Sequence, residues 1–388
     1  MNYLGYSQAT LQAAGGIWTA REIAQQPAVW ARIERGMVQE AGPLRAWLDP
    51  LLARPDLRIV LTGAGTSAFV GECLAPALKR RTQRRVEAVA TTDLVGSPRQ
   101  WLEPAVPTVL VSFARSGNSP ESVAAVAIAE SSVPDCHHLI VTCNAEGSLF
   151  RQGQRLHSSH AVLLPEETND RGFAMTSSFT GMLLAAGLAF DLAPRDTPTE
   201  LTGWANHVLE TGLPLLGNLV RSGFERVVYL GSQTFKGLAR EAALKMLELS
   251  DGRIVALADT PLGFRHGPKT IVNARTLVVV LLGNDAYARR YDLDLLNELR
   301  ADGVAGRVLA LTAQAMDVPH ADDIVLSAGA GEASDLALCL PYAVFAQVLA
   351  FLQSLALGLR PDEPNAGGTV SRVVRGVTIY PWDAVGSA

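Results

Sequence analysis

Short apolar runs that end in glycine alternate along this chain with longer segments of helical pattern. Residues 227–230 form one such run, Val-Val-Tyr-Leu, and Gly231 terminates it. The run is short and rich in β-branched residues, so it predicts a buried strand. The segment after it is rich in Ala, Leu, Glu and Lys without proline, and it predicts a helix that begins near Thr234.

The predicted helix has two faces. One is an apolar stripe at helical spacing, which predicts a side that faces a core: Leu238, Ala242, Met246 and Leu249. The other is an ionisable ridge of Glu241, Lys245 and Glu248. The simplest interpretation of the ridge is a solvated face with helical ion pairs. A functional interpretation is favoured by the loop 259–269, whose two prolines and two glycines suit the presentation of its central His266.

The same alternation continues through the first half of the chain. The polar, Ala/Gly-rich residues 1–22 predict an arm, and Thr19 and Glu22 fit a capping box for a helix that reaches about residue 40. Strands are predicted at residues 58–62, 86–91, 108–113, 139–142 and 161–164. Helices are predicted at residues 67–80, 120–130 and 176–192.

An internal repeat sets the domain organisation. Residues 58–63 resemble 226–231, residues 108–112 resemble 276–280, and residues 139–142 resemble 309–312, at offsets that agree to within about two residues. The pattern restarts after the proline-containing segment 191–198. We therefore predict an α/β protein with two tandem domains, each a mostly parallel five-stranded sheet between helices, in a Rossmann-like or flavodoxin-like three-layer arrangement. The predicted parts are an N-terminal arm and helix (1–45), a first domain (46–198), a second domain (199–360) and a C-terminal tail near the active site (361–388).

The two halves differ in sequence at the strand end where a functional site is expected. In the first half the third strand leads into residues 115–122, Arg-Ser-Gly-Asn-Ser-Pro-Glu-Ser, which combine hydroxyls with free backbone N–H groups at a helix start. The matching segment 281–286 has no serine and carries an acid. Such a turn is ordinarily only a helix cap. A second small-residue turn at 63–67, also at a strand end, favours a phosphate site in the first half. Neither turn matches a Walker loop or a dinucleotide fingerprint.

These segments together resemble the tandem sugar isomerase (SIS) family over nearly the whole chain. The resemblance rests on residues 63–67, 112–119, 241–248 and 266–268, and the isomerase half of glucosamine-6-phosphate synthase is its best-known example. Within the family the chain is most similar to the galactosamine-6-phosphate deaminase/isomerase branch, formerly described as tagatose-6-phosphate ketose/aldose isomerases. Residues 169–178 and 291–296 also look diagnostic of it.

The resemblance implies roles for individual residues. Glu248 would move the proton between C1 and C2 of the sugar, Lys245 would lie beside it, and His266 would open the sugar ring from the partner subunit. The phosphate-binding and substrate-binding positions would be Gly65, Thr66, Ser67, Arg115, Ser116, Asn118, Ser119, Ala174 and Thr176.

Two departures from the synthase pattern stand out. Ala114-Arg115 replaces a Ser-Gln pair, and Arg115 could supply a charge in place of the lost donors. The ring-opening lysine of the synthase has no clear counterpart in residues 369–382. Asp170 and Arg171 lie in a polar loop and are expected either to line the pocket or to cap the following helix.

The chemistry fits an amino-sugar phosphate as substrate. Ring opening needs an acid/base that works near neutral pH, which His266 suits. Proton transfer from C2 to C1 needs one base, which Glu248 on a rigid helix suits. The product of that transfer is an iminium at C2, which water hydrolyses with release of ammonia. No metal or redox cofactor is required, and none is predicted: we interpret His157 and His160 as solvated and His137 and His138 as structural.

The predicted function is deamination and isomerisation of galactosamine 6-phosphate to tagatose 6-phosphate and ammonia. The same reaction on glucosamine 6-phosphate and a ketose/aldose-6-phosphate isomerase without deamination are the alternatives among enzymes. A sugar-phosphate sensor is the alternative from another class. Against the sensor, no helix-turn-helix segment is recognisable outside the repeats.

The composition limits the partners and the cellular location that we expect. The chain has 48% hydrophobic and 18% charged residues and a net charge of −5, with no basic run, which argues against nucleic acid as a partner. Its four cysteines show no CxxC spacing and predict buried free thiols. The apolar stretches are too short to span a bilayer and the N-terminus lacks a signal-peptide layout, so we predict a cytoplasmic protein with no membrane partner. The apolar segment 341–357 favours a homodimer, and the family resemblance implies active sites shared between its subunits.

Overall fold

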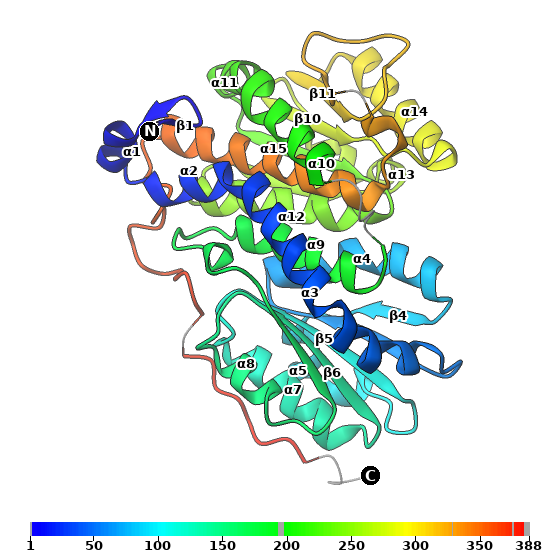
Figure 1. The fold of residues 1–388 in the computed structure, drawn as a ribbon. Coiled ribbons are helices and arrows are strands. Elements are labelled where there is room, and N and C mark those ends of the chain that lie inside the picture. The colour runs from blue at the N-terminus through cyan, green and yellow to red at the C-terminus, as the bar shows by residue number, and fades with distance from the viewer. Residues whose placement is uncertain (1, 193–197, 328, 375, 384–388) are drawn as a thin grey trace.

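Two five-stranded parallel sheets form the framework of the computed structural model, which describes residues 2–192, 198–327, 329–374 and 376–383 (Figure 1). The first sheet has the order β4-β3-β5-β6-β7. Its strands are β3 (Arg58–Thr62), β4 (Arg85–Ala88), β5 (Thr108–Ala114), β6 (Cys136–Thr142) and β7 (Ser159–Leu163). The second sheet has the order β12-β11-β10-β8-β9. Its strands are β8 (Arg226–Gly231), β9 (Val255–Asp259), β10 (Thr276–Leu281), β11 (Arg307–Thr312) and β12 (Ile324–Val325).

The two sheets repeat one topology. In each, the first strand in the chain lies between the second and the third, and the fourth and fifth follow on the side of the third. The registers also match, because Arg58 pairs with Thr108 in the first sheet as Arg226 pairs with Thr276 in the second. The predicted α/β fold with two tandem parallel sheets is therefore confirmed. The strand predicted at residues 86–91 is too long, since β4 ends at Ala88 and a helix begins at Thr91.

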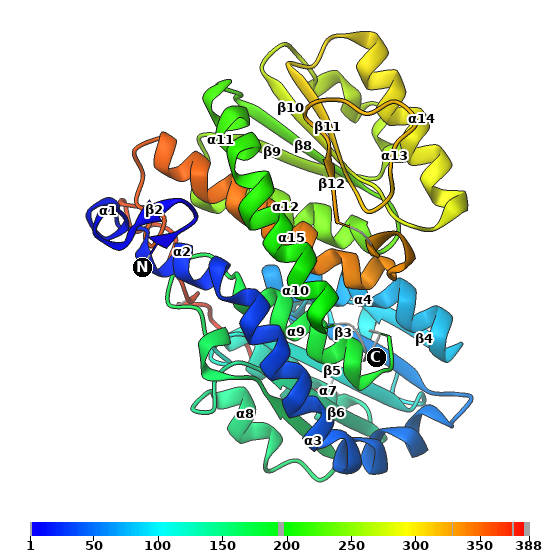
Figure 2. The same ribbon diagram turned by 45° about the horizontal axis from the view of Figure 1, so that its top comes forward.

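Helices cover both faces of each sheet (Figure 2). The helices of the first half are α3 (Gln26–Leu52), α4 (Thr66–Thr82), α5 (Thr91–Gly96), α6 (Pro98–Trp101), α7 (Pro120–Ser132), α8 (Ser148–Gly153) and α9 (Ser177–Ala189). Those of the second half are α10 (Pro198–His207), α11 (Leu213–Arg221), α12 (Thr234–Leu249), α13 (Pro261–Phe264), α14 (Ala286–Asp302) and α15 (Asp335–Ala356). The largest apolar core lies between the two sheets, and a smaller one lies under the outer helices of each. The predicted boundary at residue 45 falls inside α3, and residues 193–197 of the predicted linker lie outside the described residues.

The apolar helix α15 runs through the central core. It is long and apolar enough to cross a membrane, but 94% of its most apolar window is buried inside the protein. It packs against α11 and α12, and its Tyr342 donates a hydrogen bond to the carbonyl of Leu282. Its apolar surface is thus already covered within one subunit, so it provides no surplus apolar surface that would favour a dimer.

The N-terminal residues are part of the fold and not a loose arm. They form a two-stranded hairpin, β1 (Asn2–Tyr3) and β2 (Tyr6–Ser7), followed by α1 (Gln8–Ala14) and α2 (Ile17–Ala24). Leu4 and Leu11 are buried in the central core. The predicted capping box is also wrong, because Thr19 lies inside α2, and both Thr19 and Glu22 bond to residues far along the chain.

Helices α4 and α12 pack against each other between the sheets. Each begins directly after a residue with the same unusual backbone: Gly65 has φ 55° and ψ −126°, and Gln233 has φ 51° and ψ −120°. Each helix starts at the carboxyl edge of its own sheet. The last turns of α12 lie at the carboxyl edge of the first sheet, where Lys245 contacts Thr66.

Candidate active site

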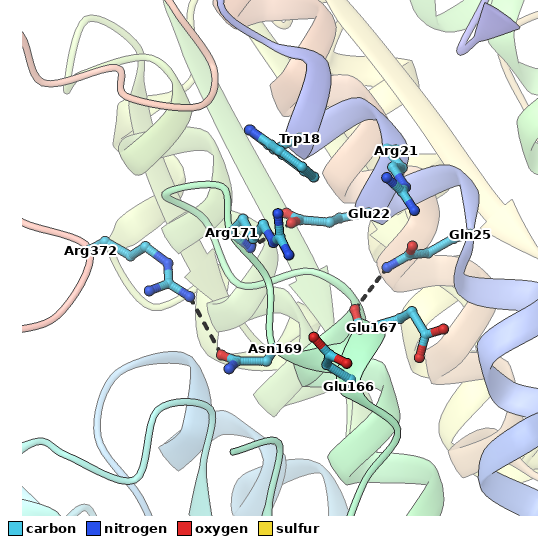
Figure 3. Close-up of a pocket in the computed structure, with 9 residues that line it drawn as sticks. All are labelled: Trp18, Arg21, Glu22, Gln25, Glu166, Glu167, Asn169, Arg171 and Arg372. Atoms are coloured by element: carbon cyan, nitrogen blue, oxygen red, sulfur yellow. Dashed lines mark hydrogen bonds between the residues drawn. The ribbon is translucent and has the colours of Figure 1, made fainter. Parts of the chain in front are cut away.

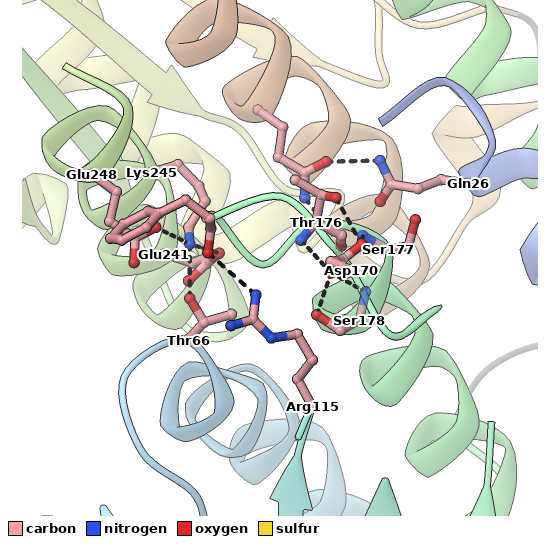
Figure 4. Close-up of polar contacts among 12 residues, drawn as sticks. Gln26, Thr66, Arg115, Asp170, Thr176, Ser177, Ser178, Glu241, Lys245 and Glu248 are labelled. Carbon is pink, nitrogen blue, oxygen red and sulfur yellow. Dashed lines mark hydrogen bonds and ion pairs between the residues drawn. The ribbon is translucent and has the colours of Figure 1, made fainter. Parts of the chain in front are cut away.

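The predicted ridge on α12 is buried and not solvated. The side chain of Lys245 is 0% exposed, that of Glu241 is 2% exposed and that of Glu248 is 24% exposed. The Nζ atom of Lys245 lies 3.5 Å from Glu241 Oε1, donates a 3.0 Å hydrogen bond to Thr66 Oγ1 and forms an ion pair with Glu248 (Figure 4). One lysine therefore sits between two carboxylates, and only Glu248 opens to solvent.

The electrostatics of this cluster follow from its burial. Burial raises the pKa of Glu241 to about 8, although the positive charge of Lys245 opposes the shift. Burial also works against the charge of Lys245, but the two carboxylates outweigh it and raise the pKa of Lys245 above its ordinary value. Lys245 therefore remains an ammonium group at neutral pH and holds its partner Glu248 in place.

Two strand-end turns lie beside this cluster. They follow β3 and β5, which are neighbours in the first sheet at the point where the strand order reverses, and ligands of open α/β sheets bind at such points. Gly63 is required here, because a Cβ atom would lie 2.6 Å from the Ser67 backbone. Thr66 and Ser67 are buried at the start of α4.

The second turn presents hydroxyl groups at the start of α7. Ser119 caps this helix, and its Oγ donates a 2.6 Å hydrogen bond to Ser122 Oγ. Asn118 Oδ1 accepts a 3.0 Å hydrogen bond from the Ser148 backbone, and the Asn118 N–H donates to Ser116 Oγ at 3.3 Å. Ser116 and Ser119 are partly exposed and Asn118 is exposed, so an anion can reach this turn.

Arg115 points from the same turn toward two carbonyl groups. Its guanidinium donates to the Phe173 oxygen at 3.2 Å and to the Arg372 oxygen at 2.7 Å, and the residue is only 6% exposed. Burial and the nearby Arg372 lower the pKa of Arg115. In this arrangement Arg115 ties the turn to the C-terminal tail.

The loop before α9 is organised by Asp170. This fully buried carboxylate accepts hydrogen bonds from the backbone N–H groups of Thr176 (2.8 Å), Ser177 (3.1 Å) and Ser178 (3.0 Å). Of the two roles expected for Asp170, the structure thus shows the capping of α9. Ala174 and Thr176 are fully buried, and the Thr176 hydroxyl donates to Asp170.

His266 lies elsewhere in the subunit. It is exposed and follows α13 at the carboxyl edge of the second sheet, where α12 begins. Glu248 is in the last turn of α12, a helix of 16 residues. At 1.5 Å per residue this helix is about 24 Å long, so one subunit does not bring its own His266 to its Glu248.

The second sheet carries a carboxylate of the chain itself at the place where the first sheet has its serine-rich turn. Asp335 Oδ1 accepts a 2.6 Å hydrogen bond from the Asn284 backbone N–H, and Asp285 caps α14. A Cβ atom at Gly283 would lie 2.8 Å from Asp335 Oδ2. The chain's own acid therefore fills the position that matches the serine-rich turn of the first half.

Of the remaining histidines and cysteines, Cys143 follows directly after β6 at the carboxyl edge of the first sheet, and Cys136, His137 and His138 lie at the amino end of β6. Within the described residues, Glu130, Cys136 and His138 have possible ligand atoms within 4.8 Å of one another, near the amino end of β6, and His138 Nε2 lies 2.7 Å from Glu130. His157 is exposed, but His160 is half-buried near Trp47 and burial lowers its pKa, so its interpretation as solvated is wrong. All four cysteines are buried and free, as predicted.

The sequence did not reveal three residues near the ends of the chain whose side chains hold the loop before α9 and the start of α2. Glu22 accepts hydrogen bonds from the backbone of Arg171 and Gly172, and Asp362 accepts from the backbone of Thr19 at 2.8 Å. Arg372 donates to the Asp170 carbonyl. No local pattern could have paired them, because each bond joins segments more than a hundred residues apart.

Comparison with known proteins agrees with this geometry. The SIS domain model matches residues 51–192. The D-galactosamine-6-phosphate deaminase AgaS of Escherichia coli is 45% identical over 377 residues, which cover 96% of this chain and 98% of that protein. An AgaS protein of Streptomyces coelicolor is 51% identical over 94% of this chain and 95% of its own length. The crystal structure of tagatose-6-phosphate ketose/aldose isomerase from Escherichia coli superimposes with a TM-score of 0.89 at 42% identity, covering 98% of this chain and all of that one.

The fold and the strand-end site thus define a tandem SIS-domain protein. Within that class, identity of this extent over the full length of its relatives shows that the chain belongs to the AgaS family.

Proposed function

We propose that this protein converts D-galactosamine 6-phosphate and water to D-tagatose 6-phosphate and ammonia. The observation that carries the proposal is the Lys245–Glu248 pair, which stands beside Thr66 at the carboxyl edge of the first sheet in a member of the AgaS family. A partly exposed carboxylate held by a buried ammonium group suits a base that must reach a bound sugar.

The phosphate group would bind at the two strand-end turns. Backbone N–H groups at the starts of α4 and α7, with the hydroxyls of Ser67, Ser116 and Ser119, can surround an anion there. This places the sugar carbons over the first sheet, toward the last turn of α12. Arg115 and the tail would close that side of the site.

Glu248 would then act on the open-chain sugar. It removes the proton from C2, and the electrons of that C–H bond form the C1–C2 double bond of an enolamine while the C1=O π electrons move to O1, which takes a proton from water or an acidic side chain. The nitrogen lone pair then forms the C2=N bond as Glu248 returns the proton to C1. The result is an iminium ion at C2. Water adds to C2, the C–N bond breaks, and ammonia leaves with the ketose as the product. Every one of these steps uses protein side chains and water, so we expect no metal or redox cofactor.

Ring opening would fall to His266 from a second subunit. Within one subunit His266 is exposed and separated from Glu248 by the length of α12. The proposal therefore includes a homodimer in which the partner subunit's His266 completes each site. It also includes a cytoplasmic location, with the amino-sugar phosphate as the partner and with no nucleic-acid or membrane partner.

A ketose/aldose isomerase without deamination is the second candidate, because the Escherichia coli structure at 42% identity carries that name. Ammonia release from galactosamine 6-phosphate and, separately, from glucosamine 6-phosphate distinguishes the possibilities, with Glu248→Gln as the blank. We expect ammonia from the galacto sugar. Release from the gluco sugar alone would change the substrate, and sugar isomerisation without ammonia would support the second candidate. Tight binding without any turnover would contradict both and support a sensor.

A further inference from the structure

A cavity lies outside the Lys245–Glu248 cluster. It has a volume of about 500 Å³ and lies between α2, the loop before α9 and the C-terminal tail (Figure 3). Small-molecule sites in proteins typically measure roughly 300–1,000 Å³, so the cavity can hold a metabolite. None of the residues assigned to the phosphate or to the acid–base chemistry lines it, and Arg171, which the sequence left as a candidate for the sugar pocket, points into this cavity instead.

Three guanidinium groups from three segments meet in this cavity. Arg171 lies 4.6 Å and Arg21 lies 5.9 Å from the centre of the Trp18 ring. Arg372 reaches in from the tail and donates to the Asp170 carbonyl. Over the described part of the chain, neither Arg21 nor Arg171 donates a side-chain hydrogen bond to a protein acceptor. Two cations therefore share one indole ring with their donors unused, an arrangement that an anion would stabilise.

The acidic side chains of the cavity offset these charges only in part. Glu167 forms an ion pair with Arg32, and the charge of Arg21 contributes further to lowering the pKa of Glu167. Glu22 is 4% exposed, and its carboxylate accepts the backbone N–H groups of Arg171 and Gly172. Glu166 is exposed and is the remaining acid in the wall. Positive charge therefore exceeds the carboxylates that face the space.

We propose that this cavity binds a small phosphorylated metabolite at a site separate from the reacting sugar. Guanidinium groups match the oxygens of a phosphate group in pairs, and Arg21 and Arg171 have donors free for this contact. The Trp18 indole supplies an apolar wall beside them.

Binding in this cavity would affect the active site through the C-terminal tail, which contacts both. Asp362 of the tail accepts from the backbone of Trp18 at 3.1 Å and of Thr19 at 2.8 Å, at the start of α2. Ten residues later the Arg372 side chain bonds the Asp170 carbonyl, while its own carbonyl accepts from Arg115. A ligand that contacts α2, the loop before α9 and the tail would hold the tail in one position. Because Arg115 of the phosphate turn donates to the Arg372 carbonyl of that tail, the ligand would also hold the turn.

Calorimetric titration of the full-length protein with inorganic pyrophosphate tests the proposal. The Ser116→Ala/Ser119→Ala variant weakens the active-site turn and leaves the cavity intact. In this background we expect one bound pyrophosphate per chain. Adding Arg21→Gln and Arg171→Gln should weaken that binding by roughly tenfold or more, since each lost charge-assisted contact is strong. Arg290→Gln, which removes an exposed arginine on α14, is the matched control and should change nothing.

Hydrogen exchange gives a readout independent of affinity and activity. Pyrophosphate should slow exchange of backbone amides in residues 360–374 of the wild-type protein but not of the Arg21→Gln/Arg171→Gln variant. Thermal unfolding without ligand verifies that the variant is folded, and Arg21→Gln alone serves if it is not. Unchanged binding after loss of both arginines, or loss of all binding with the serine variant, would overturn the proposal.

Discussion

The Nζ atom of Lys245 lies 3.0 Å from the Thr66 hydroxyl, although 179 positions separate the two residues in the chain. The contact joins the last turns of α12 in the second half to the first residue of α4 in the first half. The base proposed for the reaction and the turn proposed for the phosphate therefore come from different halves. Their relative position depends on how α4 and α12 pack.

Glu248→Gln should lower kcat by about 10²–10⁴, the range of a lost general base, and leave the free energy of unfolding within about 1 kcal/mol. Gln keeps the shape and still accepts from Lys245, but it cannot take the C2 proton. Steady-state ammonia release and urea unfolding measure the two effects. Glu225→Gln, at an exposed ion pair with Arg275, is the control and should keep full activity. Retention of activity by Glu248→Gln would remove Glu248 from the mechanism.

Lys245→Met should destabilise the protein by about 3–5 kcal/mol, because it leaves the buried Glu241 and the neighbouring Glu248 without their shared partner. Adding Glu241→Leu should restore much of this loss, since the buried carboxyl group is then removed together with its partner. Urea denaturation of the two single variants and the double variant gives the coupling free energy. Additive effects would mean that Glu241 and Lys245 do not interact.

Mixing inactive subunits should restore activity if His266 acts across a dimer. Glu248→Gln and His266→Ala subunits, each inactive alone, can form mixed dimers in which one site has both wild-type residues. Random mixing should recover about a quarter of the wild-type activity, from the geometry of closed two-fold dimers. Mixing two preparations of Glu248→Gln is the control. No recovery, with dimers verified by sedimentation, would contradict a shared site.

The titration of Glu22 should lower the free energy of unfolding as the pH rises. Burial, followed by the nearby Asp170, raises the pKa of Glu22 from 4.5 to about 8 in the folded protein. The folded state therefore holds a proton that the unfolded state has lost between these two values. The stabilisation is complete below about pH 4.5 and disappears as the pH passes 8.

Glu22→Gln removes this titration while keeping an oxygen for the Arg171 and Gly172 N–H groups. The difference in unfolding free energy between wild type and variant should change by at most about 1.4 kcal/mol per pH unit in this window. Urea midpoints at pH 5, 6.5 and 8 measure it. A difference that stays constant with pH would show that Glu22 titrates normally.

Gln233→Gly should stabilise the protein by about 1 kcal/mol or more, because Gln233 holds a backbone conformation that suits glycine. Gly65 has the same conformation in the first half, so Gly65→Ala should destabilise by a similar amount. Thermal and urea unfolding provide the measurement. Equal stability of wild type and Gln233→Gly would mean that the turn is not strained.

Much of the fold was predictable because the strands of a parallel sheet are continuous apolar runs that glycine and helix starts interrupt. Because these runs recur in the second half of the chain, they also predicted the second sheet. The sequence could not show the burial of Lys245, since a Glu–Lys–Glu ridge looks the same on a solvated helix. Its burial comes from α4, which the chain supplies 179 positions away.

The N-terminal prediction failed for a related reason. Thr19 and Glu22 have the spacing of a capping box, but Glu22 bonds Arg171, 149 positions away, and Thr19 bonds Asp362, 343 positions away. Local spacing cannot reveal such partners. The argument for a dimer from the apolar surface of α15 also failed, because 94% of its most apolar window is already buried within one subunit. The dimer itself stays a prediction.

The packing of α4 against α12 makes the two halves geometrically alike and chemically different. The helices begin at Thr66 and Thr234, so the positions on α4 that match Lys245 and Glu248 are Ala77 and Arg80. The carboxyl edge of the second sheet thus receives no acid–base pair, and Asp335 already occupies its anion position. We therefore expect only the edge of the first sheet to bind and convert the sugar. Separating the halves would take Lys245 and Glu248 away from the first sheet. The edge of the second sheet has to hold α12 in place and, in the proposed dimer, to present His266 to the partner's site.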